Sequence, residues 1–565
     1  MEPETIICDA LILGSGSAGL AAALAAGAAG LTTIVAEKTS FLGGTSAISG
    51  AGTWIPGNRH ARAASIDDSA EDALRYIEAA SPPGWYRTEA PLWRRFAEMA
   101  PETLDFLEAN SPLRFMLVGG GDPFSDLPGA RQYGRMLTPR PLAPAILGRA
   151  WATRIRPAMS AGLFTYPEII DPDLQHHPVR TSLRLLPRLA MRWLRGKRGR
   201  GTALIVGLLR GCLDRGVRLL PDCPALSLIR DDVTGDICGA ILQSPSGPIR
   251  VIARRGVVIA TGGFEWDRER LAHHFPGPID WIASPNGNAG DGHRMTEEVG
   301  GALAHMDQAN INPAVPIRYD GRLQGMALFF HRASNAIIVN RHGRRFFNET
   351  IFNFGEKIDE RDQTGSPIHL PAWLIGDQAF LRTSPILRRH RRYDPNWMVE
   401  APDIPSLAER IGLPPAELKA TVARFNGFCQ TGIDTDFGRR ACSSTASSHP
   451  DPIGLLPIGA PPFIAVPFNR SFASTKGGPR TDARGRVLRP DGSVINGLYC
   501  AGVAMASPFG TRGIGAGTTI GPNLVWGYVC GRDIAGLLDL DADATAGRMV
   551  PPPVRNSVRL NGRRP

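Results

Sequence analysis

The 565-residue sequence predicts an α/β fold in which a parallel sheet with crossover helices is interrupted by a second domain. Apolar, strand-like runs recur at residues 10–14, 32–38, 239–263 and 496–502, and helix-length stretches separate them. This alternation is typical of a parallel sheet whose strands are joined by helices. Residues 276–450 differ in residue pattern, with scattered aromatic residues, prolines and charges and no regular strand–helix alternation, so we expect a second domain inserted into the first.

A glycine-rich turn follows the first apolar run. The segment GSGSAG places Gly14, Gly16 and Gly19 in a G-x-G-x-x-G pattern directly before an alanine-rich stretch. The first glycine allows a tight turn, the second lets a pyrophosphate approach the backbone, and the third lets the helix pack against the strand. The second run ends in Glu37, where an acidic side chain accepts hydrogen bonds from a ribose. An incidental glycine turn would leave Glu37 unexplained, so the sequence predicts a Rossmann-like dinucleotide site.

The composition excludes several classes of protein. With 43% hydrophobic and 21% charged residues the chain is typical of a soluble globular protein, and no apolar run is long enough to span a bilayer. Asp9 interrupts the first apolar run and no basic segment precedes it, so we expect a strand, not a secretory signal, and a cytoplasmic protein. The eight cysteines form no C-x-x-C pair, so no metal site or attached haem is expected.

The formal net charge of +10 favours anionic partners or membrane surfaces. No nucleic-acid motif accompanies the charge, so nucleic acid is not an expected partner. A basic segment near residues 178–200 has leucines among arginines at helical spacing, with Pro187 as a potential break. It fits an amphipathic helix that lies on a membrane and delivers an apolar substrate or meets a quinone. It also fits a surface helix that covers the core and exposes a basic face, and we favour that second interpretation.

Further motifs extend along the chain, and with them the sequence resembles the FAD-dependent family that contains fumarate reductases and 3-ketosteroid Δ1-dehydrogenases. The resembling segments are KTSFLGGTSAISGAGTWIPGN (38–58), VVIATGGFEWD (257–267), GNAGDGHRM (287–295), VNRHGRRFFNET (339–350), TKGGPRTDARGRVL (475–488) and GLYCAGVAMASPFGTRGIGAGTTIGPNLVWGY (497–528). The fifth segment and GAGTTIGP are closer to the dehydrogenase branch. The resemblance implies a discontinuous FAD domain at 1–275 and 451–540, an α+β cap at 276–450 and a basic tail at 541–565.

The resemblance also implies the cofactor and its contacts. FAD is expected to be non-covalent, because GGTSAISGAG has no histidine where succinate dehydrogenases attach their flavin. The helix that begins at GAGTTIGP is expected to stabilise the negative charge that a hydride brings to the ring, with a packing turn as the alternative. The expected FAD contacts are Gly14, Ser15, Gly16, Ser17, Ala18, Gly19, Glu37, Lys38, Gly43, Gly44, Thr45, Ser46, Ala225, Thr261, Gly262, Asp291, Gly502, Gly515, Gly517, Thr518, Thr519 and Ile520.

The active-site tyrosines of the dehydrogenases do not carry over. Desaturation beside a ketone needs a base for the α-proton, an oxyanion site and the flavin. Steroid dehydrogenases use tyrosines and one glycine amide for these roles, and Gly517 falls on that glycine. Asn353 and Gly513 stand where two of the tyrosines are expected, and the third position falls on Pro123 or Phe124 of DPFSDLPG. The substrate or its protonation route is therefore expected to differ.

Other side chains are candidates for the missing roles. Arg512 is placed to bind a carbonyl or carboxylate oxygen, with a salt bridge or phosphate contact as the alternative. Arg332 aligns with a substrate-carboxylate arginine of fumarate reductases. Tyr133, His331 and Tyr319 are candidate bases, although each also fits a core or surface role. His293 is expected to support the flavin loop, and the arginines of 341–345 are expected to be structural.

The sequence thus predicts a dehydrogenase that introduces a C=C bond beside the ketone of a flat apolar substrate such as a 3-ketosteroid, passing electrons to a quinone or another acceptor. A reductase of enones or unsaturated carboxylates, motivated by Arg332 and Arg512, is the first alternative. The second is a flavin-binding protein without turnover, because the proton carriers are missing. A CoA-ester substrate is neither supported nor excluded.

Overall fold

The computed structural model describes residues 4–160, 162–171, 173–174, 177–439 and 454–538. Its largest sheet has the order β21-β22-β9-β1-β2-β6, and β8 and β7 extend it from β9. The pairings β22–β9, β9–β1, β1–β2 and β2–β6 are parallel, as the sequence predicts. The strands are β1 (Glu4–Leu13), β2 (Thr33–Ala36), β6 (Arg218–Leu220), β7 (Ala225–Arg230), β8 (Ile237–Ser244), β9 (Gly247–Ile259), β21 (Arg486–Leu488) and β22 (Val494–Cys500).

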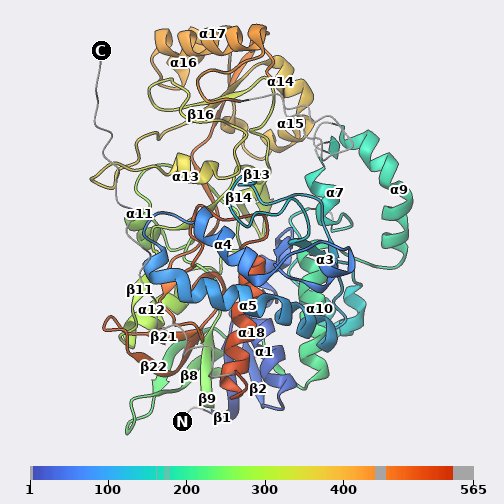
Figure 1. The fold of residues 1–565 in the computed structure, drawn as a ribbon, viewed down its shortest axis with the longest axis vertical. Helices are drawn as coiled ribbons and strands as arrows, with labels where there is room; N and C mark the ends of the chain where they lie inside the picture. Colours follow the sequence, from blue (N-terminus) through green and yellow to red (C-terminus); the bar gives the residue numbers. More distant parts are fainter. Residues whose placement is uncertain (1–3, 161, 172, 175–176, 440–453, 539–565) are drawn as a thin grey trace, which may run out of the picture.

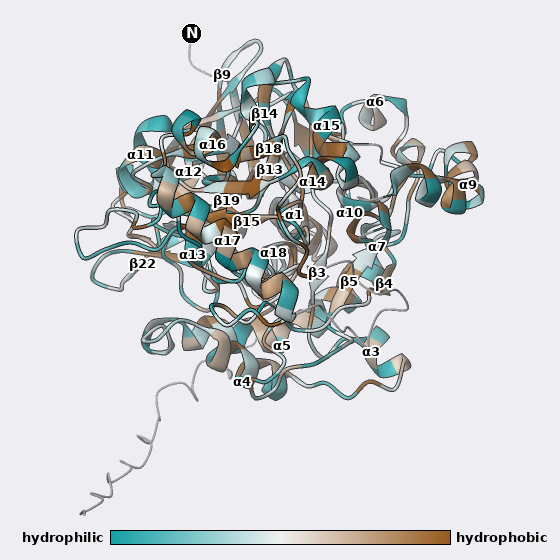
Figure 2. Cartoon of the chain, turned by 90° about the horizontal axis from the view of Figure 1, so that it is seen from above, coloured by the Kyte–Doolittle hydropathy of each residue, from teal (hydrophilic) through white to brown (hydrophobic). Residues whose placement is uncertain are grey.

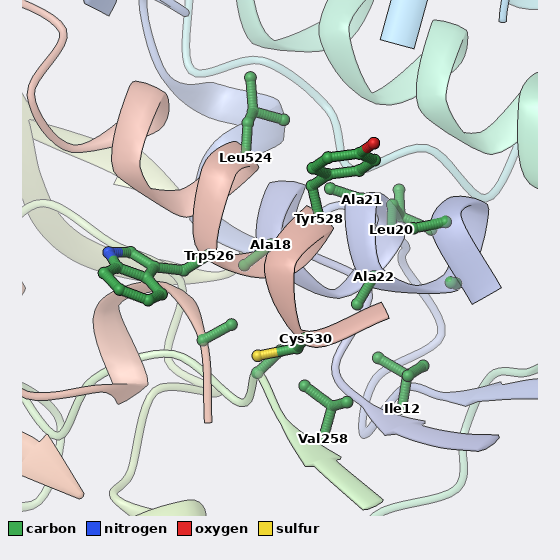
Figure 3. Close-up of a cluster of buried hydrophobic side chains, with 14 of the residues drawn as sticks. Ile12, Ala18, Leu20, Ala21, Ala22, Val258, Leu524, Trp526, Tyr528 and Cys530 are labelled. Atoms are coloured by element: carbon green, nitrogen blue, oxygen red, sulfur yellow. The ribbon is translucent and has the colours of Figure 1, made fainter. Parts of the chain in front are cut away.

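Two helices from opposite ends of the chain pack together on this sheet. Figure 3 shows side chains of α18 (Ile520–Ile534) against the alanines of α1 (Ser17–Ala28), with Ile12 and Val258 of the sheet beside them. Small residues allow the approach, since a Cβ added at Gly527 would lie 2.2 Å from the carbonyl oxygen of Ala18. The flanking helices are α4 (Ala70–Ala80), α5 (Tyr86–Asn110) and α10 (Arg200–Asp214). The C-terminal segment therefore contributes both strand β22 of the large sheet and helix α18, which packs against α1.

A second layer of structure lies at the opposite end of the molecule (Figure 1). Its main sheet has the order β15-β16-β18-β17, and its buried residues form clusters separate from that of the large sheet. The bounds are β15 (Ile337–Val339), β16 (Trp373–Gly376), β17 (Val399–Ala401), β18 (Phe463–Pro467), α13 (Phe354–Ile358), α14 (Gln378–Thr383), α15 (Pro385–Arg391), α16 (Ile404–Arg410) and α17 (Pro415–Thr431). The boundary expected near 450 therefore precedes the last strand of this sheet, and the domain limits stay a prediction.

Short elements join the two parts. One three-stranded sheet pairs β10 (Ile279–Ile282), β19 (Arg470–Thr475) and β12 (Ala309–Ile311), and another pairs β3 (Thr53–Trp54), β5 (Met136–Pro139) and β4 (Phe115–Leu117). Two hairpin-like pairs are β13 (Ala314–Tyr319) with β14 (Arg322–Ala327), and β11 (Leu303–Ala304) with β20 (Gly478–Pro479). The short helices are α2 (Gly44–Ile48), α3 (Arg59–Ala63), α6 (Arg149–Ala152), α7 (Tyr166–Ile170), α11 (Arg268–His274), α12 (Asp291–Glu298), η1 (Pro144–Leu147), η2 (Pro395–Trp397) and η3 (Gly502–Ala504).

The basic segment forms one continuous helix, α9 (Pro178–Leu194), which runs through Pro187 and projects from the edge of the molecule (Figures 1 and 2). Only Thr181 and Leu185 of this helix are buried. The favoured interpretation, a helix whose apolar face covers the core, is therefore wrong, because most of the apolar side chains of α9 face away from the protein. Among the described residues, no helix is both long and apolar enough to cross a membrane.

Candidate active site

One large cavity runs between the parallel sheet and the upper layer. Its volume is about 1410 Å³, and its walls come from the glycine turn, residues 44–52, α7, the end of β14, α15 and the loop before α18. Single-ligand pockets usually measure ~300–1,000 Å³. The cavity is therefore large enough for a dinucleotide together with a second molecule.

The glycine turn holds the first end of the cavity. Gly14 has φ +110°, and a Cβ there would lie 2.3 Å from the carbonyl oxygen of Ala260. A Cβ on Gly19 would lie 2.0 Å from the carbonyl oxygen of Gly14, so strand and helix touch at this point. Gly16 is different, because nothing lies closer than 3.8 Å to its added Cβ. Helix α1 begins after Gly16 without a side-chain cap from that residue. The amide of Ser17 donates to the hydroxyl of Ser46 at 3.1 Å, so the amides of Ala18 and Gly19 are those of the first turn that an anion such as a diphosphate can use.

Glu37 lines the cavity and also fixes the turn. Its Oε2 accepts hydrogen bonds from the amide and the hydroxyl of Ser15, at 3.1 and 2.6 Å. Its Oε1 accepts from the amide and the hydroxyl of Thr39, at 3.0 and 3.1 Å. Close by, Lys38 pairs with Asp291 at 2.8 Å. The expected ribose contact remains a proposal, and the structure adds that Glu37 holds the two loops of the nucleotide end together.

The loop before α18 closes the other end. Helix α18 follows Thr519, which provides no side-chain cap, and begins at the cavity. The amide of Gly521 donates to the carbonyl oxygen of Gly517 at 2.9 Å, and Pro522 has no amide hydrogen, so the amide of Ile520 is the one in the first turn left for a ligand. The carbonyl oxygen of Gly517 accepts a hydrogen bond from the amide of Trp54 at 3.2 Å, which holds this loop against residues 52–54. The positive end of the α18 dipole therefore points at a space bounded by the two loops.

Nearly all of the predicted FAD contacts line this cavity. The two exceptions are Gly19, which packs under the turn, and Gly43, whose added Cβ would touch Ala47 and Ile205. The open glycine turn, the two helix N-termini that face the cavity and the cavity volume all fit FAD.

A family model described as an FAD binding domain matches residues 9–520. The chain belongs to this FAD-binding family. It is 34% identical over 550 residues to a 4-oxocyclohexanecarboxylate 2-dehydrogenase of Sinomonas cyclohexanicum, covering 94% of this chain and 93% of that one. It is 32% identical to a 3-oxosteroid 1-dehydrogenase of Mycolicibacterium smegmatis, covering 93% and 97%.

A solved structure is similar over almost its entire length. It is the 3-ketosteroid Δ1-dehydrogenase from Sterolibacterium denitrificans in complex with 1,4-androstadiene-3,17-dione, with a TM-score of 0.82, 30% identity and coverage of 94% of this chain and 99% of that one. The chain is therefore an FAD-dependent oxidoreductase that acts on CH–CH bonds, and dehydrogenation beside a ketone is the chemistry of this group.

The predicted catalytic residues separate into two groups in this family member. Arg512, Gly517, Asn353 and Arg332 line the cavity. Tyr133 and His331 do not: the Tyr133 side chain is exposed, and the His331 ring is fully buried between Phe354 and Phe468. Burial holds the pKa of His331 well below its usual value. Neither residue can reach a substrate in the cavity, so neither is retained as a base.

Tyr319 lies outside the cavity, and His293 has the structural role that the sequence predicts. The hydroxyl of Tyr319 donates to the carbonyl oxygen of Pro157 at 2.6 Å, and this tyrosine is not part of the cavity wall. The Nε2 of His293 lies 2.9 Å from the carbonyl oxygen of Gly477, and burial lowers the pKa of the ring to about 4. A neutral histidine that supports the loop at Gly477 fits the structural role expected of it.

Arg512 lines the cavity and lies near two side chains of the protein. Its guanidinium carbon lies 5.2 Å from the centre of the Phe124 ring, and its Nε lies 4.0 Å from a carboxylate oxygen of Glu356. Within the described residues, that Nε donates no hydrogen bond. The side chain therefore retains a donor for a bound oxygen, in addition to a weak contact with Glu356.

The sequence analysis missed Tyr166. This residue begins α7, and its ring lies flat over residues 50–52: a Cβ on Gly50 would lie 2.6 Å from its Cδ2, and one on Gly52 would lie 3.3 Å from its Cζ. It is the only tyrosine among the described residues of the cavity wall. Burial raises the pKa of its hydroxyl, and the charge of Arg332 opposes that rise. The sequence around it marks a helix start, T-x-x-E, and contains no signal for a site.

The sequence analysis also missed Lys476, although TKGG was among the matched segments. Lys476 lines the cavity near Thr518 and Thr519 and is only 4% exposed. Its Nζ donates to the carbonyl oxygen of Gly510 at 2.6 Å, and burial lowers its pKa to about 8. Among the described residues, no carboxylate pairs with it. A buried ammonium without an anionic partner is favourable only where negative charge arrives.

Proposed function

We propose that this oxidoreductase desaturates the bond beside the ketone of a flat, apolar cyclic substrate of the 3-ketosteroid class. The observation that carries the proposal is the upper wall of the cavity, which is built from Met326, Leu328, Phe329, Phe330, Phe352, Phe354, Ile386 and Leu387. Such a wall binds fused hydrocarbon rings by removing apolar area from water. Bound FAD supplies the acceptor for the hydride that leaves the β-carbon.

The chain's own groups are proposed to bind the carbonyl oxygen. Gly517 and the ring of Tyr166 flank the same backbone: a Cβ added at Gly517 would lie 2.7 Å from the amide nitrogens of Thr53 and Trp54, and one added at Gly52 would lie 3.3 Å from Cζ of Tyr166. The amide of Gly517 and the hydroxyl of Tyr166 are the donors that we propose on this side. Because its pKa is raised, Tyr166 stays protonated at neutral pH and can donate to an oxygen that becomes negative. Arg512 is proposed to add a charge-assisted hydrogen bond to the same oxygen.

A second candidate substrate is a smaller ring ketone with a carboxylate, and a specific feature favours it. Arg332, Arg382 and Arg512 all line the cavity, and a guanidinium pairs well with a carboxylate. The relative from Sinomonas cyclohexanicum is named for such a compound. We propose a quinone, or another acceptor of its kind, as the oxidant that returns the flavin to its oxidised state.

The test is anaerobic. The purified flavoprotein is mixed in turn with a saturated 3-ketosteroid and with 4-oxocyclohexanecarboxylate, and the loss of flavin absorbance is followed. The steroid proposal predicts bleaching by the ketosteroid and an unsaturated ketone as product. If 4-oxocyclohexanecarboxylate bleaches the flavin and the ketosteroid does not, the second candidate substrate replaces the steroid. If neither bleaches the flavin while an enone reoxidises dithionite-reduced protein, both are replaced by the reductase.

A further inference from the structure

Helix α9 carries an apolar stripe that is mostly exposed. Val179, Leu183, Leu186 and Leu194 follow one another at intervals of four, three and eight residues, which places them on one face of the helix, and Trp193 lies seven residues after Leu186. The exposed fractions are 72% for Val179, 63% for Leu183, 54% for Leu186, 65% for Trp193 and 71% for Leu194. Large side chains gathered on one exposed face are rare in a monomer without a partner.

A basic flank runs beside the stripe. Arg180, Arg184 and Arg188 follow one another at intervals of four residues. Arg184 pairs with Asp171 at 2.7 Å, and no carboxylate of the described part of the chain lies within 4.0 Å of Arg180 or Arg188. The whole helix therefore presents an apolar band with unneutralised positive charge along one side, the pattern of a helix that lies in a membrane interface.

The opposite face of α9 fixes the helix to the body of the protein. Arg192 donates to both carboxylate oxygens of Glu168, at 2.6 and 2.9 Å, and to the carbonyl oxygen of Leu163 at 2.9 Å. Thr181 and Leu185 are buried on this side. The orientation of the apolar stripe is thus set by contacts to α7, and the stripe is directed outward.

The attachment places α9 at the cavity. Ile169, Ile170, Leu174 and His177 line the cavity wall, and α9 begins at the next residue, Pro178. Ile170 is 40% exposed, so apolar surface continues from the wall toward the helix. Any partner surface on which α9 rests would therefore lie next to this wall of the cavity.

We propose that α9 docks the enzyme on the surface of an anionic phospholipid bilayer. The apolar stripe inserts at the boundary of headgroups and acyl chains, and the arginines of the flank lie against lipid phosphates. Charge complementarity selects this occupant, since an apolar protein surface would leave Arg180 and Arg188 without partners. Docking brings the α7 wall of the cavity next to the lipid bilayer, in which apolar ketones and quinones are concentrated.

Flotation of the FAD-loaded protein with vesicles tests the docking without turnover, so its outcome is independent of the reaction. The vesicles contain phosphatidylglycerol and phosphatidylcholine in equal parts. We expect the wild type to float with them and the double variant Leu186→Glu, Trp193→Glu to remain in solution. The matched control is Ile433→Glu, because Ile433 is 64% exposed but isolated from α9, and it should float like the wild type. Unchanged flavin content shows that each variant is folded.

Charge is tested separately. The variant Arg180→Gln, Arg188→Gln should bind the anionic vesicles more weakly by about fivefold per arginine, the usual effect of one basic residue at such a surface. On phosphatidylcholine alone it should match the wild type. The proposal is overturned if the wild type stays in solution, or if the Leu186→Glu, Trp193→Glu variant floats equally well. It is also overturned if light scattering shows a wild-type dimer that this variant abolishes, because the stripe would then be covered by a second copy.

Discussion

The side-chain amide of Asn353 donates a hydrogen bond to the carbonyl oxygen of Gly513 at 3.2 Å. These are the two positions where the resembling dehydrogenases are expected to carry tyrosines. In this chain, the residues at the two positions form a hydrogen bond with each other instead, between the cap and the loop that precedes α18. Both residues line the cavity. A phenol from another element, Tyr166 of α7, borders the same cavity.

Replacing Tyr166 by Phe removes this phenol while keeping the ring over Gly50 and Gly52. We expect the rate of flavin reduction by the substrate ketone to fall by about 10²–10³-fold, as when one oxyanion donor is lost. Anaerobic stopped-flow absorbance measures it. Tyr319→Phe is the matched control, since that hydroxyl bonds to Pro157 outside the cavity, and it should leave the rate unchanged. Equal rates for wild type and Tyr166→Phe would remove Tyr166 from the reaction.

The glycine turn gives a test of the cofactor end. Gly19→Ala would bring a Cβ to 2.0 Å from the carbonyl oxygen of Gly14, so α1 must move away from the strand. We expect the purified variant to contain little FAD, measured as the ratio of flavin to protein absorbance. Gly427→Ala is the control: it lies in α17 with open space around its added Cβ, and should retain FAD and gain ~0.5–1 kcal/mol of stability. Full flavin content in Gly19→Ala would contradict the assignment of the turn.

Lys476 is expected to stabilise the reduced flavin. Lys476 lines one small pocket together with Thr518 and Thr519, where the family resemblance implies the flavin ring. Lys476→Met should therefore lower the midpoint potential, by about 30 mV for each tenfold loss of preference for the reduced form. Lys476→Arg, which keeps the charge, should shift the potential less. An unchanged potential in Lys476→Met would show that the ammonium does not act on the ring.

The same lysine gives a pH dependence of stability in the protein without FAD. Burial lowers the pKa of Lys476 from 10.5 to about 8, so between these values the unfolded chain binds more protons than the folded one. The free energy of unfolding should therefore rise from pH 8 to 10.5, by at most ~3 kcal/mol from this group. Thermal unfolding across this pH range should show that rise in the wild type and lose it in Lys476→Met. Identical pH profiles for the two proteins would contradict the buried site of the ammonium.

The local parts of the site were predictable from sequence. The strand, the glycine turn, the helix and the second strand follow one another directly along the chain. Gly14, Gly19 and Glu37 could therefore be assigned their places from the sequence alone. The parallel sheet followed from the alternation of apolar runs and helical stretches. These features depend on neighbours along the chain.

The remaining parts depend on tertiary contacts. Helical periodicity identifies an apolar stripe in α9 but does not say which face meets the core, and the contact of Arg192 with Glu168 turns the stripe outward. Tyr166 reaches Gly50 and Gly52 across more than a hundred residues, and Lys476 is a site residue only because its loop folds against Gly510. His331 failed as a base for the same reason, because its ring is enclosed by Phe354 and Phe468.

The most direct test of the central claim is anaerobic reduction of the bound flavin by a saturated 3-ketosteroid, with identification of the product. The account predicts loss of flavin absorbance and one molecule of the α,β-unsaturated ketone formed for each flavin reduced. Flavin that stays oxidised in the presence of the ketosteroid, in protein that dithionite reduces fully, would contradict it.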